Sequence, residues 1–198
     1  VGLMGAAVSD YPYIKELTQT LVDEQVPFTV ASLRADTLDV ELTQALAASG
    51  QRTMTVAPEA GSVKMRNIIN KGITEEHVFN AIELAAAAGM KNIKLYYMLG
   101  LPGETEEDIC EIMHLCDRVA RLYYDLIPKA ERHGKCQITA STSFFVPKPF
   151  TPFQWARMNT ASEFLGKARL VNQTMKEELN RKSIRYNWHD SDLSILEG

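Results

Sequence analysis

The sequence lacks the features that would assign it to several large classes of protein. No apolar run approaches the roughly 20 residues that span a bilayer, and the N-terminus has no basic flank followed by an apolar core and a small-residue cleavage site. Its three cysteines, Cys110, Cys116 and Cys136, are an odd number at irregular spacing, which fits neither a secreted disulfide framework nor a zinc site. We therefore expect a soluble, cytoplasmic protein without membrane contact, whose cysteines are buried or half-buried thiols.

The charge of the chain does not favour a nucleic-acid partner. The formal net charge is −4, so there is no global attraction to a phosphate backbone. The last long segment is locally basic, but Glu163, Glu177 and Glu178 interrupt it, which is more typical of a solvated helix face. Contact with RNA stays open as the less favoured interpretation. The basic residues of this segment are Lys167, Arg169, Lys176, Arg181, Lys182 and Arg185.

What the sequence does contain is a globular composition and a regular alternation of patterns. The 198 residues are 45% hydrophobic and 23% charged, a balance typical of one ordinary folded domain. Apolar, strand-like runs alternate with segments of helical period almost to Trp155, which indicates βα repetition. Five parallel strands with crossover helices predict an open or partial barrel, since closure needs more strands. The predicted strands cover residues 1–8, 26–33, 53–57, 92–99 and 136–146.

Capping residues predict where several helices begin. Asp10 is placed to cap, and Pro12 to open, a first helix that carries Leu17 toward the core. Thr105, with an aspartate three residues later, resembles a capping box ahead of a long helical period. A polar, charged helix is expected over residues 161–181, and the tail beyond it shows no usable period.

Both ends of the sequence indicate an incomplete barrel. The chain begins inside a strand pattern at Val1 and ends on a fresh apolar start at residues 194–198. We therefore expect a missing N-terminal part of the same chain to be the partner that supplies the rest of the barrel. The expected division is a barrel portion at residues 1–155 and an incomplete C-terminal helix and tail at residues 156–198.

Polar or backbone-permissive residues follow each predicted strand. In a βα fold the loops at the carboxyl ends of the strands form the active face, because side chains from several strands converge there. Each such residue also has a purely structural interpretation: Asp10, Asp36 and Ser62 can cap helices, and Arg34 can pair with Glu59. The set, in strand order, is Ser9 and Asp10; Ser32, Arg34 and Asp36; Glu59, Gly61 and Ser62; Gly100 to Glu104; and Lys148.

Four stretches resemble one enzyme family in a consistent order. Residues 96–108, Tyr-Tyr-Met-Leu-Gly-Leu-Pro-Gly-Glu-Thr-Glu-Glu-Asp, closely resemble the fifth-strand signature of radical S-adenosylmethionine (SAM) enzymes. The similarity is to the branch that contains methylthiotransferases and cobalamin-dependent members. Residues 57–74 resemble the fourth-strand loop and following helix, residues 32–36 match the third-strand position, and residues 144–153 resemble the sixth strand with its exit loop. The resemblance covers about residues 1–155.

This resemblance implies an α/β fold, a partial parallel (β/α) barrel of the TIM type, truncated and followed by a C-terminal helical extension. The family barrel has six strands, and this chain would supply strands two to six. In the family, the loop after strand one carries a CxxxCxxC motif that holds a 4Fe-4S cluster through thiolates. No cysteine pair here has that spacing, so the fragment alone is expected to bind no cluster and to be inactive. The implied cofactors are SAM and a 4Fe-4S cluster with its ligands outside this chain, and cobalamin stays open for the full-length protein.

The resemblance also implies roles for individual residues. The loop over residues 5–10 would offer backbone groups to the methionyl ammonium of SAM, Arg34 and Glu59 would face its ribose or methionyl part, and Lys71 would pair with its carboxylate. Leu99 to Pro102 would lie against the adenine, where glycines allow a close backbone approach. No catalytic residue and no metal ligand is assigned. The expected cofactor-binding residues are Ser9, Asp10, Ser32, Arg34, Glu59, Ser62, Lys71, Leu99, Gly100, Leu101, Pro102 and Gly103.

In function, the resemblance implies that a reduced cluster gives one electron to SAM, which splits into methionine and a 5′-deoxyadenosyl radical that abstracts hydrogen from an unknown substrate. A barrel that lacks a cluster and serves as a ligand-binding or scaffold module is the first alternative. An aldolase-like enzyme with Lys71, Lys94 or Lys148 as nucleophile is the second, although nothing around them indicates a desolvated lysine. The stretch Pro147–Phe153 is interpreted as a stiff wall or lid over the site, or as a connector that packs Phe150, Phe153 and Trp155 on the barrel.

Overall fold

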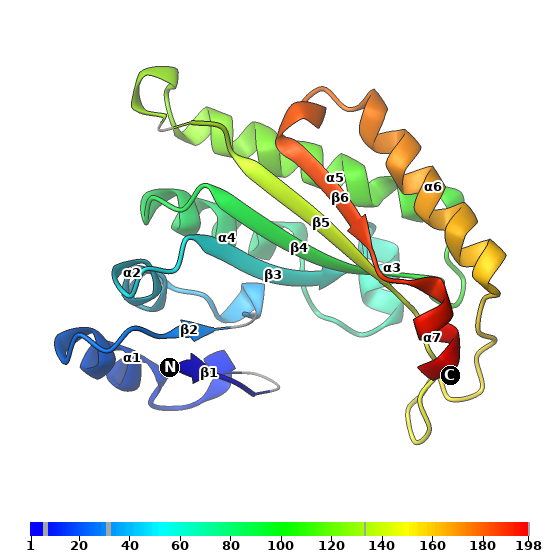
Figure 1. Cartoon of the computed structure of the whole chain (residues 1–198), viewed down its shortest axis with the longest axis horizontal. Coiled ribbons are helices and arrows are strands. Elements are labelled where there is room, and N and C mark those ends of the chain that lie inside the picture. The colour runs from blue at the N-terminus through cyan, green and yellow to red at the C-terminus, as the bar shows by residue number, and fades with distance from the viewer. Residues whose placement is uncertain (6–7, 31–32, 133, 198) are drawn as a thin grey trace.

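The chain folds as an α/β protein in which parallel strands alternate with helices (Figure 1). The computed structural model describes residues 1–5, 8–30, 33–132 and 134–197. The described strands are β1 (Gly2–Leu3), β2 (Thr29–Val30), β3 (Thr53–Glu59), β4 (Asn92–Leu99), β5 (Gln137–Phe144) and β6 (Ile184–Trp188). The described α-helices are α1 (Ile14–Asp23), α2 (Val40–Ala48), α3 (Val63–Ile68), α4 (Glu75–Ala87), α5 (Glu106–Leu126), α6 (Ala161–Glu177) and α7 (Ser191–Glu197).

Two parallel sheets make up the framework. Strands β3, β4, β5 and β6 pair in that order, β1 pairs with β2, and one bridge from Leu33 to Val56 joins the two groups. The predicted parallel α/β architecture is confirmed. Strand β6 lies in the tail where the sequence shows no usable period: it has five residues, and its outer end is exposed, so its alternation is too short to stand out. The division at residue 155 stays a prediction.

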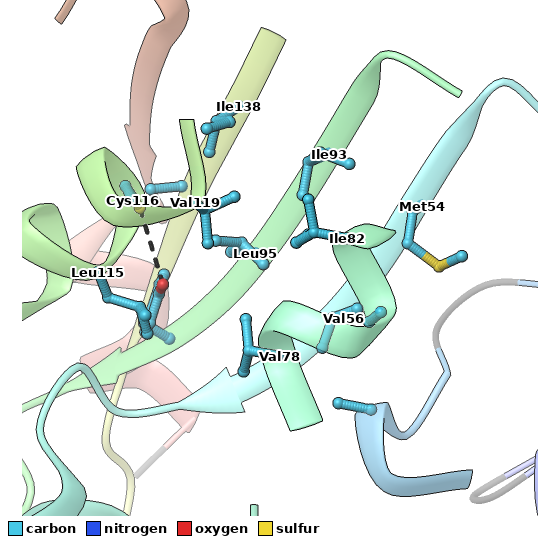
Figure 2. Close-up of a cluster of buried hydrophobic side chains, with 14 of the residues drawn as sticks. Met54, Val56, Val78, Ile82, Ile93, Leu95, Leu115, Cys116, Val119 and Ile138 are labelled. Atoms are coloured by element: carbon cyan, nitrogen blue, oxygen red, sulfur yellow. Dashed lines mark hydrogen bonds between the residues drawn. The ribbon is translucent and has the colours of Figure 1, made fainter. Parts of the chain in front are cut away.

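Helices cover one face of the larger sheet, and the hydrophobic core lies between these helices and the sheet. In β4, Ile93, Leu95, Tyr97 and Leu99 are buried, and the residues between them are only half-buried, so alternate side chains face opposite sides. Figure 2 shows Ile93 and Leu95 among apolar side chains of β3, α4 and α5. The opposite face carries the half-buried Lys94, whose ammonium lies 4.6 Å from the ring centroid of Tyr96.

Helix capping agrees with the sequence at later helices but not at the first. Thr105 accepts a hydrogen bond from the Asp108 amide, and the Asp108 side chain accepts one from the Thr105 amide, which completes the predicted capping box of α5. The expected start of the first helix is wrong: α1 begins at Ile14, after a 3-10 turn that contains Asp10. Leu17 is also 37% exposed. Thr18 takes the inward position because its hydroxyl donates to the carbonyl oxygen of Ile14 at 2.9 Å, so burial costs it no hydrogen bond.

Gly61 sets the spacing between the loop after β3 and helix α5. A Cβ atom at this position would lie 2.3 Å from the backbone nitrogen of Ile112, so the helix and the loop would have to separate. We expect Gly61→Ala to lower the free energy of unfolding by about 3 kcal/mol, as overpacking does in rigid cores. Urea denaturation measures this change. Gly166→Ala in α6 is the control, because no atom lies within 4 Å of its added Cβ, and an unchanged Gly61→Ala midpoint would contradict the packing argument.

Candidate functional site

The carboxyl ends of β3, β4 and β5 meet at one end of the larger sheet (Figure 1). The loops that follow β3 and β4 are neighbours there, because Ala60 and Leu101 pack in one small apolar cluster with Met65 and Phe145. Glu59 ends β3 at a break in the strand register and has a positive φ of 68°. A non-glycine residue in this conformation is uncommon and is found where the surroundings hold it in place.

A pair of opposite charges lies at the end of β3. Lys71 Nζ donates to Glu59 Oε1 at 2.9 Å, and about a quarter of each side chain is exposed. Lys71 follows helix α3, so the loop and the short helix bring together two residues that are twelve positions apart. The pair presents a cation and an anion side by side at the strand end. Such a pair is complementary to a zwitterion, whose carboxylate and ammonium carry the opposite order of charges.

Arg34 belongs to a separate cluster beyond β2. Its guanidinium donates to both carboxylate oxygens of Asp36, at 3.1 and 2.7 Å, and lies 3.9 Å from Asp10. The alternative in which Arg34 pairs with Glu59 is wrong. Arg34 pairs with Asp36, only two residues away, and Glu59 pairs with Lys71. The hydrogen bonds from Arg34 lower the pKa of Asp36. Ser9 accepts a hydrogen bond from Thr37 at 2.7 Å in the same region, and Ser32 lies outside the described residues.

Asp108 connects the loop after β3 to the start of α5. Its carboxylate accepts hydrogen bonds from the Ser62 hydroxyl at 2.6 Å and from Lys64 Nζ at 2.5 Å. Ser62 also caps α3 by accepting from the Met65 amide, which confirms its structural role. Burial opposes ionisation of Asp108, but the hydrogen bonds from Lys64, Ser62 and Thr105 outweigh it and lower the pKa.

The low pKa of Asp108 predicts a loss of stability in acid. The interaction stabilises the fold above the unfolded carboxyl pKa of about 3.9 and is lost as pH falls through the lower, folded value. Asp108→Asn should therefore be less stable at pH 7, by about 1–2 kcal/mol, and its stability should depend less on pH below about pH 5. Thermal unfolding across this pH range tests the prediction, and parallel curves for both proteins would contradict it.

The loop after β4 is held by a buried carboxylate. Glu104 accepts a hydrogen bond from the Gly100 amide at 2.9 Å and from Lys167 Nζ of α6 at 2.7 Å, although its side chain is only 3% exposed. Burial raises the pKa of Glu104 against the opposing effect of Lys167. Gly100 has a positive φ of 89°. A Cβ there would lie 2.6 Å from the Phe164 ring, so the absence of a side chain at Gly100 lets the loop backbone lie close to α6. This loop is therefore fixed by the helix behind it.

The other residues of the Gly-Leu-Pro-Gly loop have different surroundings. Leu99 is buried in the main core, Leu101 lies in the small apolar cluster, Pro102 is half-buried, and Gly103 has open space around its Cα. A cavity of about 390 Å³ lies beside the loop and is also lined by Arg157 and Lys167. The expected contacts of Leu99 to Gly103 with a cofactor stay predictions.

The proline-rich exit of β5 packs through one of its three aromatic residues. Phe153 contacts Phe145 edge-on, with ring centroids 6.0 Å apart. Phe150 and Trp155 are 99% and 91% exposed, so the interpretation that all three pack on the barrel is wrong. Phe150 also has a positive φ of 62°. The role of this stretch as a wall or lid stays a prediction.

The comparison with known families decides the identity of the fold. The model of the radical SAM superfamily matches residues 1–116, more than half of the chain. The chain belongs to the radical SAM superfamily. Coproporphyrinogen III oxidase (HemN) from Escherichia coli, a radical SAM enzyme, has a similar fold, with a TM-score of 0.53 at 14% identity over 81% of this chain and 36% of that one.

Two relatives are similar to this chain over most of its length. The uncharacterized protein MJ0966 of Methanocaldococcus jannaschii is 38% identical over 178 residues, which are 90% of this chain and 36% of the relative. The tRNA-2-methylthio-N(6)-dimethylallyladenosine synthase of Wolinella succinogenes is 25% identical over 179 residues, 86% of this chain and 37% of that enzyme. The chain thus spans a little over a third of the length of these relatives.

Radical SAM proteins in general use SAM and a 4Fe-4S cluster, and the chain's residues fit the first group but not the second. The charges of Lys71 and Glu59 complement the methionyl part of SAM, and the buried apolar cluster that contains Leu101 lies next to them through Ala60. Burial raises the pKa of Cys116 and of Cys136 to about 12, so both thiols stay protonated, whereas cluster ligands are thiolates. Within the described ranges, no group of three or more metal-binding side chains exists.

Some residues that shape this site were not among the cofactor-binding residues expected from the sequence. Glu104 belongs to the quoted signature, but only the structure reveals its burial against Lys167. Arg66 is buried and donates to the carbonyl oxygens of Ala60 and Gly61, at 3.1 and 2.7 Å. A basic residue on a short helix carries no sequence signal for burial.

None of the described helices has the length and apolar character needed to cross a bilayer.

Proposed function

We propose that this chain is part of a radical SAM enzyme, an oxidoreductase or transferase, which cleaves SAM at a 4Fe-4S cluster and acts on its substrate through a 5′-deoxyadenosyl radical. The observation that carries the proposal is the Glu59–Lys71 pair at the strand ends of a superfamily fold, next to the loop after β4. The cofactor supplies the radical chemistry, and the protein binds, orients and excludes water.

Individual residues of this chain would bind SAM in distinct ways. Lys71 Nζ would exchange its bond to Glu59 for one to the carboxylate of the methionyl group, and Glu59 would then accept from the methionyl ammonium. The apolar cluster around Leu101 would exclude water from the adenine. Glu104 would hold the Gly100 amide and keep the loop in place through Lys167. Ser9, Asp10 and Arg34 lie in the loops after β1 and β2 and would contribute further polar contacts.

The remaining components lie outside this chain in the proposal. The cluster ligands would come from an N-terminal part of the same protein, because Cys116 and Cys136 are buried, protonated thiols and no cysteine pair has the CxxxCxxC spacing. Cobalamin stays a prediction for the whole protein, with no described residue assigned to it. The substrate is unidentified, and RNA stays open as a substrate class. We place the protein in the cytoplasm, since free cysteines are typical of a reducing compartment.

Anaerobic reconstitution tests the proposed function. The full-length protein and this fragment would be treated with iron and sulfide, and cluster absorbance and 5′-deoxyadenosine formation would be measured. We expect a cluster and SAM cleavage in the full-length protein alone. Neither signal in either protein would favour the alternative of a barrel without a cluster that serves as a ligand-binding or scaffold module.

A further inference from the structure

Strands β5 and β6 begin at the other end of the sheet (Figure 1). A second cavity is lined by residues at these strand starts. Its volume is about 200 Å³. The eight residues of β5 separate it from the loops at the carboxyl ends of the strands, a distance of roughly 25 Å at about 3.3 Å per residue. The cavity is therefore distinct from the candidate SAM site. Its lining residues are Lys135, Cys136, Gln137, Lys182, Ser183 and Arg185.

Strand pairing explains why these residues converge. Ile138 of β5 pairs with Ile184 of β6. The residues just before each strand, including Lys135 and Lys182, therefore lie at the same end of the sheet. Arg185 pairs with Thr139 one step further along. With the amide of Gln137 turned to satisfy both of its polar atoms, the amide oxygen accepts from Arg185 Nε at 2.6 Å. This hydrogen bond orients the guanidinium in its place at the cavity.

The charge of the cavity lining has one sign. Three of the six residues are cationic, and the lining includes no carboxylate. Lys135, Lys182 and Arg185 form no ion pair with any described residue, whereas Lys15, Lys64, Lys71 and Lys167 each do. The whole chain is nevertheless acidic, with a net charge of −4, so this concentration is local. Cations held together without a counter-charge favour the binding of a multivalent anion.

The neutral members of the lining also suit an anion. Ser183 is buried, and its hydroxyl lies 2.7 Å from the hydroxyl of Tyr124. Either hydroxyl can be the donor, so the Ser183 hydroxyl can donate its proton to an anion while it accepts from Tyr124. Cys136 is buried and its raised pKa keeps it uncharged, so it does not compete as an anion. A planar guanidinium beside two flexible ammonium groups is a combination that suits phosphate oxygens.

We propose that this cavity binds the dianionic phosphate group of a phosphate monoester. A monoester carries close to two negative charges at neutral pH. Three cations in a lining without a carboxylate would complement this charge better than the single charge of a carboxylate or a phosphodiester. The ligand is either a small phosphorylated molecule or the 5′-phosphate end of a nucleic acid, and both present the same group. The inference does not depend on the proposed SAM chemistry.

Calorimetric titration of the full-length protein tests the cavity. Inorganic phosphate and 5′-AMP are the small probes, and a short RNA with or without a 5′-phosphate is the large one. We expect Lys182→Gln and Arg185→Gln each to weaken binding of inorganic phosphate by about tenfold or more, the effect of losing one charge-assisted contact. Arg169→Gln is the matched control, because Arg169 is exposed on α6 and does not line the cavity, and it should leave the affinity unchanged.

The titrations distinguish the sources of the phosphate and can overturn the inference. Binding of 5′-AMP without binding of either RNA supports a small ligand, and binding of the 5′-phosphorylated RNA alone supports a nucleic-acid end. Equal binding of both RNAs, or an equal loss in Arg169→Gln, would show diffuse attraction and overturn the proposal. Absence of any heat change or phosphorus NMR shift up to about 10 mM phosphate, beyond the range of weak specific binding, would also overturn it.

Discussion

Replacing Lys71 with glutamine is expected to weaken SAM binding by the reconstituted full-length protein about 10- to 100-fold. The lysine is the cation that would meet the carboxylate of the methionyl group, and a charge-assisted contact of this kind contributes about 1.5–3 kcal/mol. Glu59, left without its partner at 2.9 Å, would in addition repel that carboxylate. Equilibrium dialysis with labelled SAM measures the affinity, and 5′-deoxyadenosine formation follows turnover.

A matched control separates the loss of this contact from the loss of an ordinary ion pair. Lys15 pairs with Asp39 and Glu41 at 2.7 and 2.9 Å between α1 and α2, away from the strand ends. Lys15→Gln should leave SAM affinity unchanged. Wild-type affinity in Lys71→Gln would remove Lys71 from the site, whereas absence of SAM binding in the wild-type protein would contradict the proposed function itself.

Replacing Arg66 with alanine should cause the largest loss of stability, about 3–5 kcal/mol. The side chain is 1% exposed and supplies the hydrogen bonds of the Ala60 and Gly61 carbonyl oxygens. Alanine would leave both acceptors unsatisfied and open a cavity under the loop after β3, and each effect is costly. Urea denaturation measures the loss. Arg52→Ala, at an exposed position before β3, should change stability by less than about 0.5 kcal/mol.

Arg66→Met tests which part of the side chain matters. Nε and Nη2 of Arg66 have no partner among the described residues, and burial lowers its pKa, so the charge itself is poorly compensated. Methionine would fill the space and remove this unpaired charge while leaving the two carbonyl oxygens bare. We expect a smaller loss than for alanine, about 1–2 kcal/mol. Equal losses for both variants would assign the whole effect to the hydrogen bonds.

The sequence predicts those elements whose signals are local. The capping box at Thr105 and the long amphipathic period after it define α5, and the alternation of β4 requires only its own eight residues. The Gly-Leu-Pro-Gly signature likewise identifies the loop after β4 and the superfamily. In contrast, among the described residues of the predicted strands over 1–8 and 26–33, only Gly2–Leu3 and Thr29–Val30 form strands. Apolar character there reflects packing, which does not by itself require backbone pairing.

Details of the candidate site that depend on distant residues could not be predicted. Glu104 and Lys167 are 63 positions apart, and Ser62 and Asp108 are 46 apart. Nothing in either local pattern identifies the partner, because a charged residue near a glycine-rich turn is usually exposed. Arg34 shows the opposite error: a partner far away in sequence was plausible, but Asp36 lies within two residues and forms both hydrogen bonds.

The single described bridge between the two sheets, from Leu33 to Val56, leads us to expect that the sheets open separately. Among the described strands it is the only backbone pairing between the two sheets, and each strand of the smaller sheet contributes two paired residues. Protection from hydrogen exchange depends on the free energy of the opening that exposes each amide. Native-state exchange should therefore show β1 and β2 opening as a separate cooperative unit, at lower free energy than β4 and β5, which pair along their full length. The N-terminal segment would then loosen while the helices and strands behind the loop after β4 remain folded.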